Sequence, residues 1–202
     1  MSNEGVDDGR RRFLTAATSV VGAAGAAAVV WPFLASLKPS AKAQAAGAPV
    51  QADISKIEEG QQVTFVWRGS NIWVLRRSKD MVASLSQVTA QLSDPKCEQD
   101  QQPAYCKNET RSIKPEFLVM NGKCTHLGCS PSFKPDHPAP EIDANWLGGY
   151  FCPCHGSKYD LAGRVFNGMP APLNMVVPPH RYVSDTVVVI GEDPTDAKKE
   201  AA

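Results

Sequence analysis

CPCHGSKY (residues 152–159) and CTHLGC (residues 124–129) are the two stretches that decide what this chain folds around. Each of these boxes offers two cysteines and one histidine within a few residues, and together they hold four of the six cysteines in the chain. Thiolate and imidazole groups gathered this closely are typical of metal ligands rather than of scattered core cysteines. We therefore expect one metal centre held between two loops.

The spacing within each box indicates which side chains act as ligands. Alternate residues of an extended segment point the same way, so Cys124 and His126 share one face. A proline-bearing turn lets Cys152 and His155 converge while the cysteine between them points elsewhere. Equal use of both boxes gives two cysteine and two histidine ligands and leaves one cysteine of each box over as a matched pair, Cys129 and Cys154.

Two kinds of metal centre fit two cysteines and two histidines. One is a tetrahedral zinc site. The other is a [2Fe–2S] cluster with the cysteines on one iron and the histidines on the other. The spacing leaves both open. A cluster held only by cysteines is less favoured, because it would leave the histidines idle.

Composition excludes some classes of partner. The 202 residues include 21 Lys and Arg and 21 Asp and Glu, so the net charge is zero. A chain without excess positive charge offers no basic surface for nucleic acid. We expect no nucleic-acid partner.

The N-terminus predicts export and membrane anchoring. Residues 16–37 carry no charge, and a helix of this length spans a hydrocarbon core of roughly 30 Å. Three arginines precede it, which the positive-inside rule places in the cytoplasm. The run RRRFL resembles a twin-arginine signal with Arg10 and Arg11 as the pair. We predict a cytoplasmic N-terminus over 1–12 and a transmembrane helix over 13–37 that Pro32 kinks or ends.

The following residues, KPSAKAQAAGAP over 38–49, are small, polar and punctuated by Pro and Gly. They predict a flexible or extended linker, not a folded element, which lets the outer domain move. Within it, AKAQA resembles a small-residue cleavage site.

The outer head domain over residues 50–191 is predicted to be mainly β and antiparallel. Strands are expected over 63–67 and 72–76 around an RGSN turn, in EFLVMNG and GGYFCPC before the two boxes, and as a hairpin in YVSDTVVVIG. One helix is expected in SKDMVASLSQVTAQLSDP, with a proline-rich loop between the boxes. The tail over 192–202 is expected to be disordered.

Taken together, CTHLGC and CPCHGSKY resemble the boxes of the Rieske iron–sulfur subunit of the ubiquinol–cytochrome c reductase (cytochrome bc) complex. The likeness extends along nearly the whole chain, through the signal anchor, the linker and the proline loop NGMPAPLN. It implies a Rieske-type fold with a cluster-binding part over 121–173 and an anchor that stays attached. One departure is Met169, where the family often has Gly directly before Pro-Ala-Pro.

The resemblance also assigns residues. It implies a [2Fe–2S] cluster with Cys124 and Cys152 on one iron and His126 and His155 on the other, and a disulfide between Cys129 and Cys154. It implies that Ser157 donates a hydrogen bond to a bridging sulfide and that Tyr159 donates to the sulfur of Cys124. Such bonds stabilise the reduced cluster and raise its potential.

The implied activity is quinol oxidation within a complex. His155, with His126 also exposed, would take part catalytically: ubiquinol, bound at the outer quinone site of a cytochrome b subunit, would hydrogen-bond to His155. The electron would pass to a c-type haem subunit, contributing to the proton-motive force. The implied location is the bacterial inner membrane, with a single pass, the N-terminus in the cytoplasm and the head in the periplasm. Rival interpretations are the Rieske subunit of an arsenite-oxidase type, a plastoquinol-oxidising relative, an oxygenase ferredoxin, and a structural zinc module.

Four further residues outside the two boxes are expected to have structural roles or none in the metal centre. Cys97 and Cys106 flank a polar loop, and we expect, by a small margin, that they form a second disulfide outside the membrane. His137 and His180 are expected to be solvated loop histidines rather than ligands.

Overall fold

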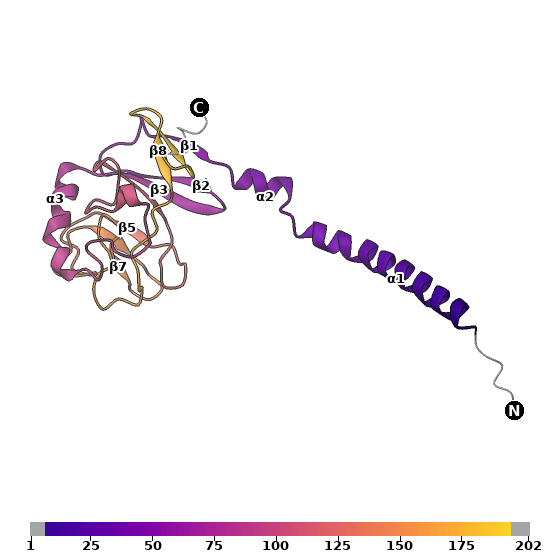
Figure 1. The fold of residues 1–202 in the computed structure, drawn as a ribbon. Helices are drawn as coiled ribbons and strands as arrows, with labels where there is room; N and C mark the ends of the chain where they lie inside the picture. Colours follow the sequence, from indigo (N-terminus) through magenta and orange to yellow (C-terminus); the bar gives the residue numbers. More distant parts are fainter. Residues whose placement is uncertain (1–6, 195–202) are drawn as a thin grey trace. The chain divides into compact units, whose positions relative to one another are not determined.

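The computed structural model describes residues 7–194 of the chain, with the side chain of residue 46 left aside. The chain divides into two compact units, residues 1–45 and 46–202. Each unit is described by itself (Figure 1).

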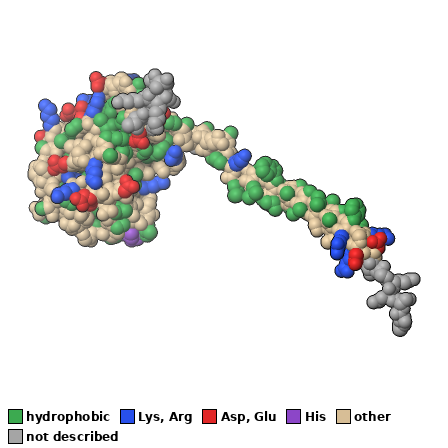
Figure 2. All heavy atoms as spheres, viewed as in Figure 1, with side chains coloured by type: hydrophobic (Ala, Val, Ile, Leu, Met, Phe, Trp, Pro, Cys, Tyr) green, Lys and Arg blue, Asp and Glu red, His purple; other side chains and the backbone are tan. Residues whose placement is uncertain are grey.

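The N-terminal unit is dominated by helix α1, Asp8–Ser36. Its first turn is capped by Asp7, whose carboxylate accepts hydrogen bonds from the backbone N–H groups of Gly9 and Arg10. No side chain of α1 is buried, and Figure 2 shows apolar side chains along it with charged ones gathered at its N-terminal end. By length and composition, this is the one helix among the described residues that could cross a membrane.

Helix α1 differs from the predicted span at both ends. It begins five residues before the predicted residue 13, because Asp7 supplies a cap and the arginines favour helix. Pro32 lies inside the helix, which ends at Ser36. The predicted linker is also partly wrong, because Ala41–Ala46 form helix α2. Ala, Lys and Gln are strong helix formers, and the hydroxyl of Ser40 accepts the N–H of Ala43.

The head contains three antiparallel sheets of three strands each, as predicted for a mainly β domain. The first has the order β1 (Val50–Asp53), β9 (Val187–Ile190), β8 (His180–Tyr182). The second has the order β2 (Gln62–Trp67), β3 (Ser70–Arg76), β4 (Phe117–Asn121). The third has the order β5 (Ser132–Lys134), β6 (Gly149–Phe151), β7 (Lys158–Tyr159). The helical segments are α3 (Lys79–Gln87) and two 3₁₀ turns, η1 (Thr89–Gln91) and η2 (Ala104–Cys106).

Strands β3 and β4 are buried on both faces because they separate two apolar cores. Successive side chains of a strand point to opposite faces. In β3, Ile72 and Val74 enter the core shared with β1 and β9, whereas Trp73 and Leu75 enter the core shared with the third sheet. The strands of the third sheet flank the two boxes, so one face of β3 and β4 packs in the same core as the residues that position the site.

Most of the predicted elements are present, with shifted bounds. The β2–β3 hairpin turns on only two residues, Arg68 and Gly69, both with positive φ, which matches the right-handed twist of its strands. The predicted helix ends early, at Gln87, before the 3₁₀ turn η1. Strand β5 lies in the stretch expected to be loop, where three residues pair with β6. A three-residue strand among prolines has too little periodicity to be recognised.

Three minor expectations were wrong. His180 is fully buried in β8, where its Nδ1 pairs with the carbonyl of Pro178 at 2.9 Å. Cys97 and Cys106 are buried free thiols and not a disulfide. The start of the predicted disordered tail is held by side-chain bonds: Glu192 pairs with an arginine of β8 at 2.7 Å, and Asp193 accepts the hydroxyl of Tyr105 at 2.8 Å. Residues 195–202 lie outside the described part of the chain.

His137 is exposed, as expected.

Candidate metal centre

The two boxes fold into loops with the same hydrogen-bond pattern. In the first, the N–H of Cys124 donates to the carbonyl of Cys129, five residues on, at 2.8 Å, and the N–H of Gly128 donates back to Cys124 at 2.9 Å. In the second, Cys152 donates to Ser157, again five residues on, at 2.8 Å. The N–H of Gly156 donates back to Cys152 at 2.9 Å.

A glycine closes both loops for the same reason. Gly128 has φ of 80° and Gly156 has φ of 76°, a conformation that other residues adopt only with strain. The repeated glycine, four residues after the first cysteine of each box, is therefore a local sequence signal for two equivalent loops.

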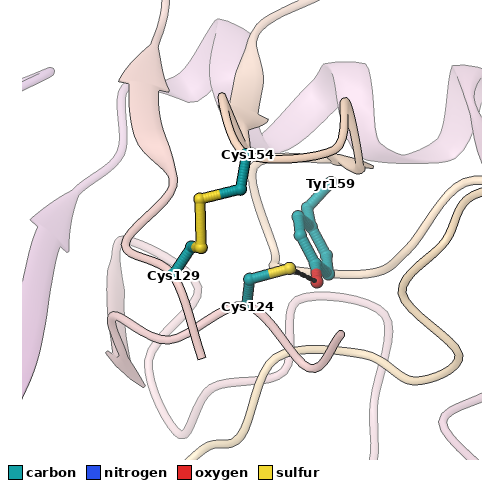
Figure 3. Close-up of a disulfide and its surroundings, with 4 residues drawn as sticks. All are labelled: Cys124, Cys129, Cys154 and Tyr159. Carbon is teal, nitrogen blue, oxygen red and sulfur yellow. Dashed lines mark hydrogen bonds between the residues drawn. A yellow bond between two sulfur atoms is a disulfide. The ribbon is translucent and has the colours of Figure 1, made fainter. Parts of the chain in front are cut away.

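A disulfide joins the two loops, as the resemblance implied. Cys129 and Cys154 are bonded, with their Cα atoms 6.7 Å apart (Figure 3). Cys124 and Cys152 remain free thiols and are 3% and 1% exposed. The Cys152 Sγ lies within 4.8 Å of both disulfide sulfurs. Since disulfide sulfurs are not thiolates, Cys124 and Cys152 are the two box cysteines that remain available to a metal.

The histidines lie together on the outer side of the loops. The ring centroids of His126 and His155 are 4.7 Å apart. His155 is exposed and His126 is half-buried. The Nδ1 atom of His126 is buried and has no hydrogen-bond partner among the described residues. Buried polar atoms are nearly always paired, so an orphaned imidazole nitrogen beside free thiols fits a metal ligand.

Comparison with known proteins decides which kind of centre this is. Residues 48–179 match the family described as "Rieske [2Fe-2S] domain", and residues 1–40 match "Ubiquitinol-cytochrome C reductase Fe-S subunit TAT signal". The curated "Ubiquinol-cytochrome c reductase iron-sulfur subunit" of Allochromatium vinosum is 56% identical over 193 residues, 96% of this chain and 93% of the relative. Its namesake from Blastochloris viridis is 43% identical, over 94% of this chain and 97% of the relative. The chain belongs to the Rieske iron–sulfur subunits of ubiquinol–cytochrome c reductase.

A solved chain of "Hyperthermophilic respiratory Complex III" is also similar, with 23% identity and a TM-score of 0.47 over 86% of this chain and 98% of that one. The cofactor of a Rieske domain is a [2Fe–2S] cluster. The residues present fit that group: the two boxes supply two free thiols and two neighbouring imidazoles, and the buried Nδ1 of one imidazole has no hydrogen-bond partner among the described residues.

In this Rieske domain the hydrogen bonds around Tyr159 limit where its hydroxyl proton can point. The Tyr159 hydroxyl accepts the N–H of Thr125 at 3.1 Å and lies 3.1 Å from the Sγ of Cys124 (Figure 3). The Thr125 hydroxyl donates to the carbonyl of Leu173 at 2.6 Å, so its own proton is already used. The Tyr159 proton is therefore left for one of two acceptors, the Cys124 sulfur at 3.1 Å or the Thr125 hydroxyl oxygen at 3.3 Å. A bond to the sulfur is the one that the resemblance implies.

The electrostatics of the two thiols differ. Burial raises the pKa of Cys124, but hydrogen bonds, led by the one from Tyr159 and including one from Ser157, outweigh burial and leave that pKa below the ordinary thiol value. Burial raises the pKa of Cys152, and the neighbouring Cys124 adds to the increase. Hydroxyl donors thus already favour negative charge on one of the two sulfurs.

The proline loop over residues 168–173 closes another side of the site. The Ser157 hydroxyl oxygen accepts the N–H of Ala171 at 3.1 Å, and Thr125 holds Leu173. Met169, at the departure from the family pattern, is half-buried and packs against the core of the site. The role of Thr125 was not predicted from the sequence. A threonine between Cys and His gives no sign that its hydroxyl bonds to a residue 48 positions away.

Proposed function

We propose that this chain is the electron-transfer subunit of a quinol–cytochrome c oxidoreductase, active as part of that complex and not alone. The observation that carries the proposal is the pair of loops with thiols buried on the inner side and imidazoles on the outer side. Membership in the Rieske subunits of ubiquinol–cytochrome c reductase supports it.

Within the site, Cys124 and Cys152 would hold one iron, and His126 and His155 the other. The burial of both thiols and the orphaned Nδ1 of His126 support this division. A Rieske cluster, when bound, takes up one electron at a high potential, because neutral imidazoles replace two thiolates.

The outer imidazoles provide the link to substrate. His155 is exposed, so the ring nitrogen that is not used for iron is open to a ligand. A quinol hydroxyl can donate a hydrogen bond to that nitrogen, which places the imidazole to receive the proton as the electron leaves the quinol. His126 is less exposed and would take a supporting part.

The inferred partners are a cytochrome b subunit, which supplies the quinol site, and a c-type haem subunit, which receives the electron. Leu127, which follows His126 in the chain, exposes 71% of its surface, which suits contact with an apolar partner surface. We place the chain in the bacterial inner membrane, with α1 as a single span, the arginines at its start in the cytoplasm and the head in the periplasm. Residues 38–49 would tether the head.

The test is to purify the protein from membranes together with its partners. We expect an iron-containing, coloured protein with a low-temperature EPR signal in the reduced state and quinol-dependent reduction of cytochrome c. A colourless protein that contains stoichiometric zinc would indicate the structural zinc module. Reduction of a haem acceptor with arsenite, but not with quinol, would indicate the arsenite-oxidase type.

A further inference from the structure

The head contains three buried arginines, and only one of them has a carboxylate partner. Among the described residues, the fully buried charged side chains are Arg77, Arg111, Arg164 and Asp160. Arg164 pairs with Asp160, Nε to Oδ2, at 2.7 Å. Two positive charges are therefore left without a buried negative charge. A buried, uncompensated charge costs free energy, so its presence asks for an explanation.

Arg111 uses its guanidinium entirely on neutral acceptors. Its Nη1 donates to the carbonyls of Ala162 and Gly163 at 3.0 and 3.2 Å. Its Nη2 donates to the carbonyl of Met175 at 2.6 Å and to Oε1 of Gln102 at 3.0 Å, and Nε donates to the same Oε1. A Cβ at Gly163 would approach within 3.3 Å of Nη1, so the glycine leaves room for the charge.

Arg77 is buried in the same manner. Its Nη1 donates to the carbonyls of Thr110 and Leu161, and its Nη2 donates to the hydroxyl of Ser112 at 2.8 Å. Burial lowers the pKa of Arg77 to about 10 and also lowers the pKa of Arg111. A guanidinium stays protonated in proteins near neutral pH, so both side chains carry a full positive charge.

Both cations are bound to the buried core that also holds the two free thiols. The residues whose carbonyls they hold, Leu161, Ala162 and Met175, pack in the same core as Cys124 and Cys152. The exposed face of the site is the histidine face, where water screens charge. The guanidinium groups and the thiols are all buried, and charges in a buried region are screened much less than exposed ones.

We propose that Arg111, assisted by Arg77, is an electrostatic tuning residue that raises the reduction potential of the cluster from within the buried core that holds the two thiols. The inference rests on the proposed function, because it requires that the cluster be present. Reduction adds one negative charge to the site, and a fixed positive charge in a poorly screened region favours the reduced state. The energetic cost of burying the guanidinium is balanced by its hydrogen bonds, and its charge acts on the electron acceptor.

A merely structural clamp is the competing explanation, because Arg111 also ties Met175, which follows the proline loop, to Gly163. The two explanations separate by charge. Arg111→Gln removes the charge and most of the bonds, whereas Arg111→Lys keeps the charge and loses several bonds. Asp160→Asn removes the one buried negative charge but retains an oxygen to accept the N–H groups of Ala162 and Arg164. Arg68→Gln removes an exposed charge at the β2–β3 turn and serves as the control.

Each variant would be purified as the full chain in its complex, and the cluster titrated by EPR at fixed potentials. At the wild-type midpoint, Arg111→Gln should lower the ratio of reduced to oxidised cluster at least about threefold, or roughly 30 mV at 59 mV per tenfold. Arg111→Lys and Arg68→Gln should stay near the wild-type ratio. Asp160→Asn should move the ratio in the opposite direction, toward the reduced cluster.

The outcomes decide between the explanations. Equal ratios for Arg111→Gln and Arg111→Lys, with intact EPR signals, would overturn the inference in favour of a clamp. Should Arg111→Gln fail to retain its cluster, the Asp160→Asn titration decides, and an unchanged or lowered ratio overturns the inference. A wild-type protein without the EPR signal would instead refute the proposed function.

Discussion

Replacing Tyr159 by phenylalanine removes one hydroxyl group from the metal centre and leaves the ring in place. The hydroxyl is 3.1 Å from the Sγ of Cys124, and its oxygen already accepts the N–H of Thr125, so its proton can point at that sulfur. Tyr159 is fully buried, so water cannot replace the lost donor. Burial raises the pKa of Tyr159 above its ordinary value, which keeps the hydroxyl protonated and able to donate.

The expected effect follows from the strength of this bond. A hydrogen bond to a charged acceptor contributes about 1.5–3 kcal/mol. The sulfur carries more negative charge in the reduced cluster, so most of that free energy favours the reduced state. At 59 mV per ~1.4 kcal/mol for one electron, Tyr159→Phe should lower the midpoint potential by roughly 60–130 mV. Ser157→Ala should also lower the potential while the cluster is retained, because the Ser157 hydroxyl lowers the pKa of Cys124 and so favours negative charge on that sulfur.

The assay is a redox titration followed by EPR or by circular dichroism of the cluster. Tyr150→Phe is the matched control, since Tyr150 is equally buried in the adjacent strand but its hydroxyl donates to Oε1 of Gln62 at 2.8 Å. The control should lose about 1 kcal/mol of stability and leave the potential unchanged. A Tyr159→Phe protein with an intact signal and the wild-type potential would show that the proton does not face the sulfur, and the reasoning would be wrong.

Three further outcomes can be measured on the same protein. Replacing both Cys129 and Cys154 by serine opens a loop with a separation of 25 residues and should lower the free energy of unfolding by about 3–4 kcal/mol; an unchanged denaturation midpoint would contradict this. Burial holds the pKa of His180 below its unfolded value of about 6.5. The unfolded state then binds more protons, so the contribution of His180 to the free energy of unfolding is fully present above about pH 6.5 and decreases as pH falls below it. His180→Asn should remove this part of the pH dependence. If the wild-type and variant proteins showed the same dependence of unfolding free energy on pH, the assignment would be wrong. Burial raises the pKa of Cys106 to about 12 and also raises the pKa of Cys97, so neither thiol should react with iodoacetamide in the folded protein. Both should be labelled after unfolding without reductant. A disulfide-linked peptide that contains both cysteines would contradict the assignment of free thiols.

Features that depend on short stretches of the chain could be predicted from the sequence. The ligand types in CTHLGC and CPCHGSKY follow from spacing, because residues a few positions apart are neighbours in any loop. Helix α1 followed from an uncharged run, and the β2–β3 hairpin from alternation around a glycine-containing turn. These features need no information about the rest of the fold.

Contacts between distant segments required the tertiary structure. His180 looks like a loop histidine among prolines, yet pairing of β8 with β9 buries it. Cys97 and Cys106 are near in sequence, but both are buried free thiols, and the Cys97 Sγ contacts the carbonyl of Asn108 instead of the other sulfur. The hydrogen bond from Thr125 to Leu173 joins residues 48 positions apart, and the one from Arg111 to Met175 joins residues 64 positions apart. A side chain's neighbours across such separations are set by how the sheets pack, and neither periodicity nor composition of a single segment encodes that packing. The sequence alone therefore predicted which side chains would bind the metal, while the fold decided the hydrogen bonds and buried charges that surround them.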